Sequence, residues 1–178
     1  MWIGTTTDGA YRLQLDKNEL THPILKGKIN SIYQDIEGEL WIGSWEEGLH
    51  HVKTDGTIEI FEYDAKNPYS ISSNFVRACC EDNLGNIWIG TFNGLNRYDK
   101  STGLFQNHTA SDAQSDGLTH SSIWCIVKDN QGTLWLGTYF GGVNYFNPEY
   151  EIYSRYMYSP IEKKGLSNPV VGRTIEDK

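Results

Sequence analysis

One short phrase occurs four times in the chain: Trp2-Ile3-Gly4-Thr5, Trp41-Ile42-Gly43-Ser44, Trp88-Ile89-Gly90-Thr91 and Trp135-Leu136-Gly137-Thr138. The tryptophans of successive copies of this phrase are 39, 47 and 47 residues apart. A fixed period of this size with strand-like content indicates an array of one supersecondary unit, and propeller blades fit it best. The phrase therefore predicts an all-β fold built from repeated sheets, which more readily forms a binding platform than a buried catalytic centre.

An aspartate precedes each of the last three repeat tryptophans by six residues, and a glycine follows each aspartate by three. The pairs are Asp35 and Gly38, Asp82 and Gly85, and Asp129 and Gly132. A carboxylate that accepts backbone N–H bonds, followed by glycine in the left-handed conformation, is typical of a turn between antiparallel strands. A calcium loop is the weaker interpretation, because the spacing does not match an EF-hand.

Each period contains four short strands, which we letter A to D. Strand A is the apolar segment before the aspartate, strand B carries the tryptophan, strand C follows a glycine-containing turn, and strand D is aromatic. The predicted fold is a β-propeller with four blades of four antiparallel strands, or a four-blade fragment of a larger propeller array. The predicted blades are residues 28–74, 75–121 and 122–169, after strands B to D of a first blade in residues 1–27.

The terminal segment 170–178 repeats the strand A pattern, with Val171 six residues before Asp177. It either completes the first blade and closes a ring of four, or it forms a severed edge. An open arc exposes strand edges and sheet faces and can pair with a second copy as a homodimer. The closed monomer, the dimer and the open arc all remain alternatives, and the incomplete first and last repeats indicate a piece of a longer protein.

Composition excludes several classes of function. The chain has 178 residues, a net charge of −8, 38% hydrophobic and 13% aromatic residues, so it folds and offers no basic stripe for nucleic acid. The adjacent Cys79 and Cys80 point to opposite faces of a strand, and no Cys-x-x-Cys pair occurs. The histidines are scattered. We therefore expect no metal, no cofactor and no catalytic residues, and neither a signal peptide nor a membrane span is visible in the sequence.

The segment from Asn74 to Asp99 resembles the two-component regulator propeller repeat, as do Ser121 to Phe146 and Lys28 to Val52. The shared elements are an apolar pair before Glu/Lys-Asp, the phrase Leu/Ile-Trp-Ile-Gly-Thr, and Gly-Leu-x-Arg-Tyr. The resemblance implies a periplasmic sensor region of a hybrid two-component system, whose parent protein supplies the membrane helix, the histidine kinase and the phosphorelay. It also implies that this segment is not itself an enzyme and that it meets the membrane only through the parent protein.

In up-and-down blades the B–C turns and the D–A connections emerge on one face. Residues that differ between copies on these loops are the candidate ligand contacts, since the fold does not dictate them. Exposed aromatic rings beside amides and charges suit a sugar ring, so we expect an oligosaccharide or a partner domain. The alternative is that these rings only cap the blade ends or pack against neighbours that the chain lacks. The candidates are Trp45, Glu46, Phe92, Asn93, Tyr139 and Phe140 on the B–C turns, with Arg77, His120 and Trp124 near the starts of strands A.

Two other functions compete with a sensor. A propeller lyase resembling streptogramin-inactivating enzymes requires a histidine and a glutamate that face a metal-bound substrate, and the scattered histidines argue against it. A purely structural dimerisation scaffold requires that the candidate aromatic residues be buried against a second chain.

Overall fold

The computed structural model describes residues 1–21, 23–110, 117–150, 152–159 and 165–177. These residues form fifteen strands in four antiparallel sheets and contain no helix, hence none that is long and apolar enough to cross a membrane. The first sheet is β1 (Trp2–Gly4), β2 (Ala10–Gln14) and β3 (Glu19–Leu20). The second is β4 (Ile29–Gln34), β5 (Leu40–Ser44), β6 (Leu49–Val52) and β7 (Ile58–Phe61).

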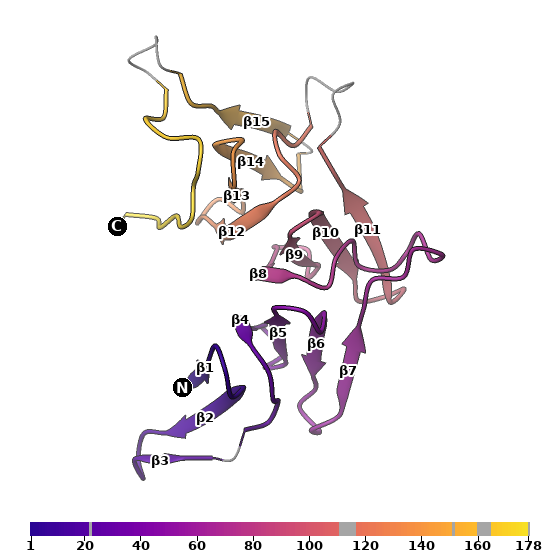
Figure 1. Cartoon of the computed structure of the whole chain (residues 1–178), viewed down its shortest axis with the longest axis vertical. Helices are drawn as coiled ribbons and strands as arrows, with labels where there is room; N and C mark the ends of the chain where they lie inside the picture. The colour runs from indigo at the N-terminus through magenta and orange to yellow at the C-terminus, as the bar shows by residue number, and fades with distance from the viewer. Residues whose placement is uncertain (22, 111–116, 151, 160–164, 178) are drawn as a thin grey trace.

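The last two sheets repeat the order of the second. The third is β8 (Val76–Glu81), β9 (Ile87–Thr91), β10 (Gly94–Asp99) and β11 (Leu104–His108). The fourth is β12 (Ile123–Lys128), β13 (Leu134–Thr138), β14 (Val143–Asn147) and β15 (Ile152–Tyr156). The sheets stand side by side along an arc, with β4, β8 and β12 on its inner side and β7, β11 and β15 on its outer side (Figure 1). The predicted all-β propeller architecture is confirmed.

The C-terminal segment does not complete the first sheet. Residues 167–177 form no strand, and the first sheet holds only β1, β2 and β3 among the described residues. The segment instead runs along the fourth sheet, where the Val171 N–H donates to the Thr138 carbonyl at 3.0 Å. In Figure 1 the first sheet and this segment lie at opposite ends of the arc. The described residues thus form an open arc, and the homodimer inferred from open edges stays a prediction.

Close packing of one blade on the next explains why the C-terminal segment lies along the fourth sheet. A Cβ added at Gly90 would lie 2.7 Å from Ile123 Cγ2, so only glycine lets β12 approach β9 this closely. The same test at Gly137 meets the Val171 carbonyl at 2.6 Å. Val171 therefore occupies on the fourth sheet the place that Ile123 occupies on the third, which is the place of a following strand A.

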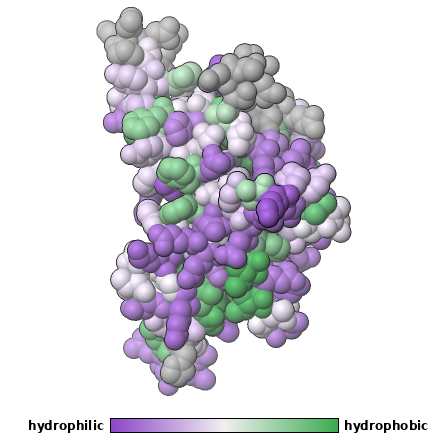
Figure 2. Space-filling model, turned by 45° about the vertical axis from the view of Figure 1, so that its right-hand side comes forward, coloured by the Kyte–Doolittle hydropathy of each residue, from purple (hydrophilic) through white to green (hydrophobic). Residues whose placement is uncertain are grey.

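Two of the repeat tryptophans, Trp41 and Trp88, pack between sheets. Trp41 and Trp88 are 0% and 1% exposed. The ring of Trp41 lies 5.3 Å from Tyr98 of the third sheet, and that of Trp88 lies 5.3 Å from Phe146 of the fourth. The hydrophobic cores thus lie between blades, and Cys79 and Cys80, both buried free thiols, face two different cores. On the outer side, Ile58 and Ile60 of β7 are exposed. Figure 2 shows a compact hydrophobic patch in the lower half of the molecule.

Each repeat aspartate holds its tryptophan. The indole Nε1–H of Trp88 donates to Asp82 Oδ2 at 2.7 Å, while Oδ1 accepts the backbone N–H groups of Leu84 and Asn86. Asp35 and Asp129 bind the turn N–H groups after them and their own tryptophans, at 2.9 and 2.8 Å, in the same way. The turn assigned from sequence is therefore also the anchor of the blade core.

We expect Asp82→Ala to lower the free energy of unfolding by about 3 kcal/mol, because it leaves a buried indole N–H and turn amides without acceptors. Asp129→Ala should cost roughly half as much, because Trp135 is only half-buried and water can replace the lost acceptor. Urea unfolding of both variants measures the difference. Equal losses would show that the indole bond does not depend on burial in the core.

Two histidines, the buried His50 and the partly buried His108, predict acid lability. Burial lowers the pKa of His50, and burial together with the nearby Arg97 charge lowers the pKa of His108. Both rings are neutral in the fold, so as pH falls below about 6.5 the unfolded chain takes up protons that the folded chain does not, and stability is lost. The variant His50→Asn, His108→Gln should lose less stability between pH 7 and about pH 5. Urea unfolding at the two pH values tests this; identical slopes for variant and wild type would contradict it.

Candidate functional site

A β-bulge near the start of strand A directs one residue per blade toward the inside of the arc. The pairing register shifts between Ile29 and Ser31, between Val76 and Ala78, and between Ile123 and Cys125. Bulges commonly re-aim a side chain beside a functional site. The bulged residues Asn30, Arg77 and Trp124 all line one cavity of about 620 Å³, which we call the central cleft.

The central cleft has walls from three sheets and from the terminal segment. Its lining residues are Asn30, Ser31, Trp45, Arg77, Ala78, Cys79, Trp124, Cys125, Ile126, Gly172 and Arg173. Asn30 is already engaged, because its side-chain amide donates to the carbonyls of Ser44 and Val76 at 3.2 and 2.9 Å. It ties the second blade to the third and leaves Arg77 and Trp124 as the bulge residues that face the cleft with unused binding capacity.

Aromatic side chains of the B–C turns continue from the cleft, and Phe75, directly before β8, lies between two of them. The rings of Trp45 and Phe75 lie 5.8 Å apart, and those of Phe75 and Phe92 lie 6.1 Å apart. Trp45 is 41% and Phe92 55% exposed. Rings with this exposure present flat apolar surface to solvent instead of filling a core.

A second group of rings lies on the fourth blade. Trp124 stacks on Tyr139 with centroids 5.7 Å apart and planes at 13°, and Tyr139 meets Phe140 at 4.3 Å. His120 lies 6.4 Å from Tyr139 and 6.2 Å from Phe140. The candidates that the sequence places on separate loops therefore form one contiguous group.

Arg77 joins the two groups. Its guanidinium carbon lies 5.2 Å from the Phe92 ring and 4.5 Å from the Trp124 ring, and Nη1 donates to Ser122 Oγ at 2.8 Å. Burial lowers the pKa of Arg77. We call the resulting continuous surface the aromatic row; it comprises Trp45, Phe75, Phe92, Arg77, Trp124, Tyr139, Phe140 and His120.

Two predicted contacts stand apart from the row. Glu46 and Asn93 are exposed on the B–C turns beside Trp45 and Phe92, but neither lines the central cleft. Sequence reasoning also missed Asn30, Phe75 and Arg173. Asn30 was detectable, because it follows Ile29 as Arg77 follows Val76 and Trp124 follows Ile123, one period apart.

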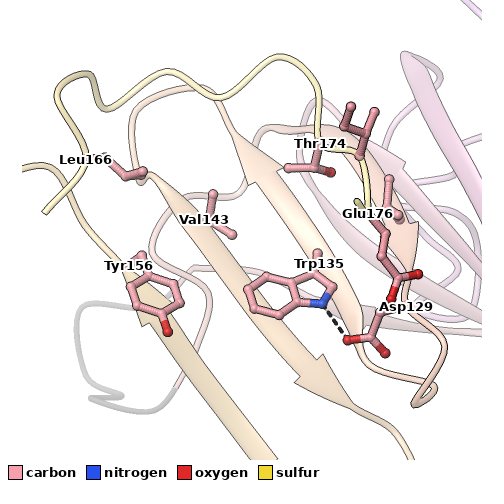
Figure 3. Close-up of a pocket in the computed structure, with 9 residues that line it drawn as sticks. Asp129, Trp135, Val143, Tyr156, Leu166, Thr174 and Glu176 are labelled. Atoms are coloured by element: carbon pink, nitrogen blue, oxygen red, sulfur yellow. Dashed lines mark hydrogen bonds between the residues drawn. The ribbon is translucent and has the colours of Figure 1, made fainter. Parts of the chain in front are cut away.

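Two other features belong to the scaffold. A cavity of about 380 Å³ lies between the fourth sheet and the terminal segment, where Trp135 points toward Val143 and Tyr156 and donates to Asp129 (Figure 3). This cavity lies on the face of the fourth sheet that corresponds to the faces at Trp41 and Trp88, which the following sheets cover.

Among the described residues, one carboxylate cluster could hold a metal ion: Asp35, Glu37 and Glu39, with ligand atoms within 4.8 Å of one another.

The ammonium of Lys100 already pairs with that cluster. It lies 3.0 Å from Asp35 and 2.9 Å from Glu37, and it also reaches Glu81 at 3.4 Å. Burial opposes ionisation of Asp35, but the hydrogen bonds from Trp41 and Lys100 outweigh it and lower the pKa of that carboxyl. The cluster thus serves as an ion-pair contact between the second and third blades.

Three segments match the family of the two component regulator propeller: residues 23–46, 70–93 and 117–140. These three segments are similar to the repeat of this family. Each matched segment runs through strands A and B into the B–C turn, so it contains both the bulge and the exposed aromatic positions of its blade. No curated protein matches this sequence.

Solved structures share the fold. The extracellular domain of the putative hybrid two component system BT3049 from B. thetaiotaomicron is 23% identical with a TM-score of 0.76, over 99% of this chain and 22% of that one. The extracellular domain of BT4673 from the same organism is 23% identical with a TM-score of 0.74, over 96% and 22%. The propeller chain thus spans less than a quarter of the length of these two proteins.

Virginiamycin B lyase from Staphylococcus aureus also has this fold, at 14% identity and a TM-score of 0.67, over 92% of this chain and 53% of that one. The described residues that line the central cleft of the present chain include no histidine and no carboxylate. At 14% identity the likeness to the lyase concerns the fold alone.

We expect the aromatic row to contribute little to stability. Phe92→Ala and Tyr139→Ala should each change the free energy of unfolding by less than about 1 kcal/mol, because the two side chains are 55% and 40% exposed and neither belongs to the buried cores. Trp88→Ala, which empties a buried core position, should cost roughly 3–5 kcal/mol. Chemical denaturation of the three variants gives the comparison. A core-sized loss for either exposed ring would mean that the row holds the blades together.

Proposed function

We propose that this chain is an extracytoplasmic sensor segment of a hybrid two-component receptor and that it recognises an oligosaccharide at the central cleft and the aromatic row. The observation that carries the proposal is the continuity of exposed rings from Trp45 through Arg77 to Phe140, beside a cleft of about 620 Å³. The propeller repeats and the architecture of the extracellular two-component domains support the sensor role. The described residues of the cleft and the aromatic row can bind a ligand but offer no acid–base pair. They therefore fit recognition better than a chemical reaction.

The chemistry of the row suits carbohydrate. A pyranose ring has an apolar face that stacks on aromatic rings, and a rim of hydroxyls that require hydrogen-bond partners. The rings of Trp124 and Tyr139 are nearly parallel, which is the geometry in which flat apolar faces stack. Around them the Arg77 guanidinium and the His120 imidazole provide polar groups at the same face.

The cleft also offers a means of signalling. Its walls belong to separate blades and to the terminal segment, so a ligand that contacts several walls favours one relative spacing of them. A ligand shifts an equilibrium only by its difference in affinity for the two arrangements. In the proposed receptor, the favoured blade arrangement is the signal that the parent protein passes across the membrane to its histidine kinase.

Isothermal calorimetry of the chain with a broad panel of oligosaccharides tests the proposal. At least one glycan should bind, and Trp124→Ala should weaken that binding by about tenfold, because the loss of an aromatic stacking contact costs roughly 0.5–1.5 kcal/mol beyond the apolar area that it buries. Tyr63→Ala is the matched control, since Tyr63 is 52% exposed but lies outside the aromatic row. Absence of binding across the panel, or equal effects of the two variants, would contradict oligosaccharide recognition at this site.

A further inference from the structure

We propose that the ligand of the central cleft is anionic, a sugar that bears a carboxylate or a sulfate group, and that Arg77 and Arg173 bind this group. The inference rests on the proposed function and narrows its class of ligand. It depends on the environment of one guanidinium and on the charge of the cleft.

Arg77 is a half-buried cation without a counter-ion. No carboxylate of the described residues forms an ion pair with it, and its guanidinium donates a hydrogen bond to the neutral hydroxyl of Ser122. A guanidinium has five N–H donors, so most of its donor capacity remains for a ligand. Desolvating a charge costs free energy that an opposite charge recovers, and the lowered pKa of Arg77 has that same physical cause.

The cleft is positive within a negative protein. The chain carries 23 acidic and 15 basic residues, yet the charged residues among the described cleft lining are two arginines, Arg77 and Arg173. Arg173 comes from the terminal segment and Arg77 from the third blade, so the two cations reach the cleft from different walls. Carboxylates elsewhere, such as Asp35 and Glu37, are already paired with Lys100. A local positive potential of this kind selects and steers an anion.

The arrangement suits an acidic sugar better than a free anion. Arginine binds carboxylate and sulfate oxygens in a bidentate manner through the edge of its planar group. The Phe92 and Trp124 rings that contact Arg77 are 55% and 38% exposed, so apolar surface adjoins the charge. A uronic acid or a sulfated sugar combines a ring face for the aromatic side chains with an anionic group for the guanidinium.

Binding assays with matched acidic and neutral probes test the inference. The probes are uronic-acid oligosaccharides from polygalacturonate, alginate and hyaluronan, their methyl esters, which keep the backbone and remove the charge, and sulfated galactan fragments. The variants are Arg77→Gln and Arg173→Gln. Arg155→Gln is the control, because it removes the same charge from an exposed position of β15 outside the cleft.

We expect at least one acidic probe to bind, its ester or unsulfated form to bind at least about tenfold more weakly, and Arg77→Gln to cause a similar loss. Arg173→Gln should weaken the same probe, Arg155→Gln should not, and added salt should weaken binding of the acidic probe only. Thermal unfolding checks each variant; if Arg77→Gln does not fold, Arg173→Gln decides. A response to carboxylate or to sulfate probes identifies which anion is bound.

Two results would overturn the inference. If neutral glycans bind as tightly as acidic ones, or if both cleft variants bind the acidic probe like the wild type, the ligand is not selected by charge, although oligosaccharide recognition stands. If no acidic or neutral glycan binds, the inference and the proposed function fall together.

Discussion

The hydrogen bond between a repeat aspartate and its indole N–H is the interaction on which the blades depend. One carboxylate both closes the A–B turn through its backbone bonds and fixes the tryptophan ring six residues later. The ring cannot leave the core without breaking the turn, and the turn cannot open without releasing a buried N–H. Local and long-range order are therefore coupled in every repeat after the first.

A fixed ring sets the distance between neighbouring blades. Trp41 contacts Tyr98 of the next sheet, while Gly43, two residues later, allows Val76 of that sheet to approach its backbone. A large residue and a residue with no side chain thus act together on one strand. Because each blade buries its core against a neighbour, stability is shared between nearest neighbours, as in other repeat proteins.

The fold was predictable because it repeats. Each blade is marked within its own sequence by an Asp-x-x-Gly turn and a Trp-x-Gly strand, and these recur with a period of 47 residues. The strands and the inter-blade role of Trp88 therefore follow from sequence alone. The course of the terminal segment did not follow, because Val171 fits equally a strand that closes the first sheet and one that packs on Gly137. The contiguity of the site was also hidden: a 47-residue spacing shows that Arg77 and Trp124 are equivalent, but only the structure shows the bulge that turns both into one cleft.

The bulge separates the demands of the fold from those of recognition. Flanking residues such as Val76 and Ala78 pair with β9 and must stay small or apolar, whereas Arg77 between them is skipped by the ladder and faces the cleft. Substitution at a skipped position changes what the cleft presents without altering the register. The three bulges carry an amide, a guanidinium and an indole, and these differ far more than the residues beside them. A repeated scaffold can in this way present a non-repeated surface, which a fold of equivalent blades requires if it is to recognise an asymmetric ligand.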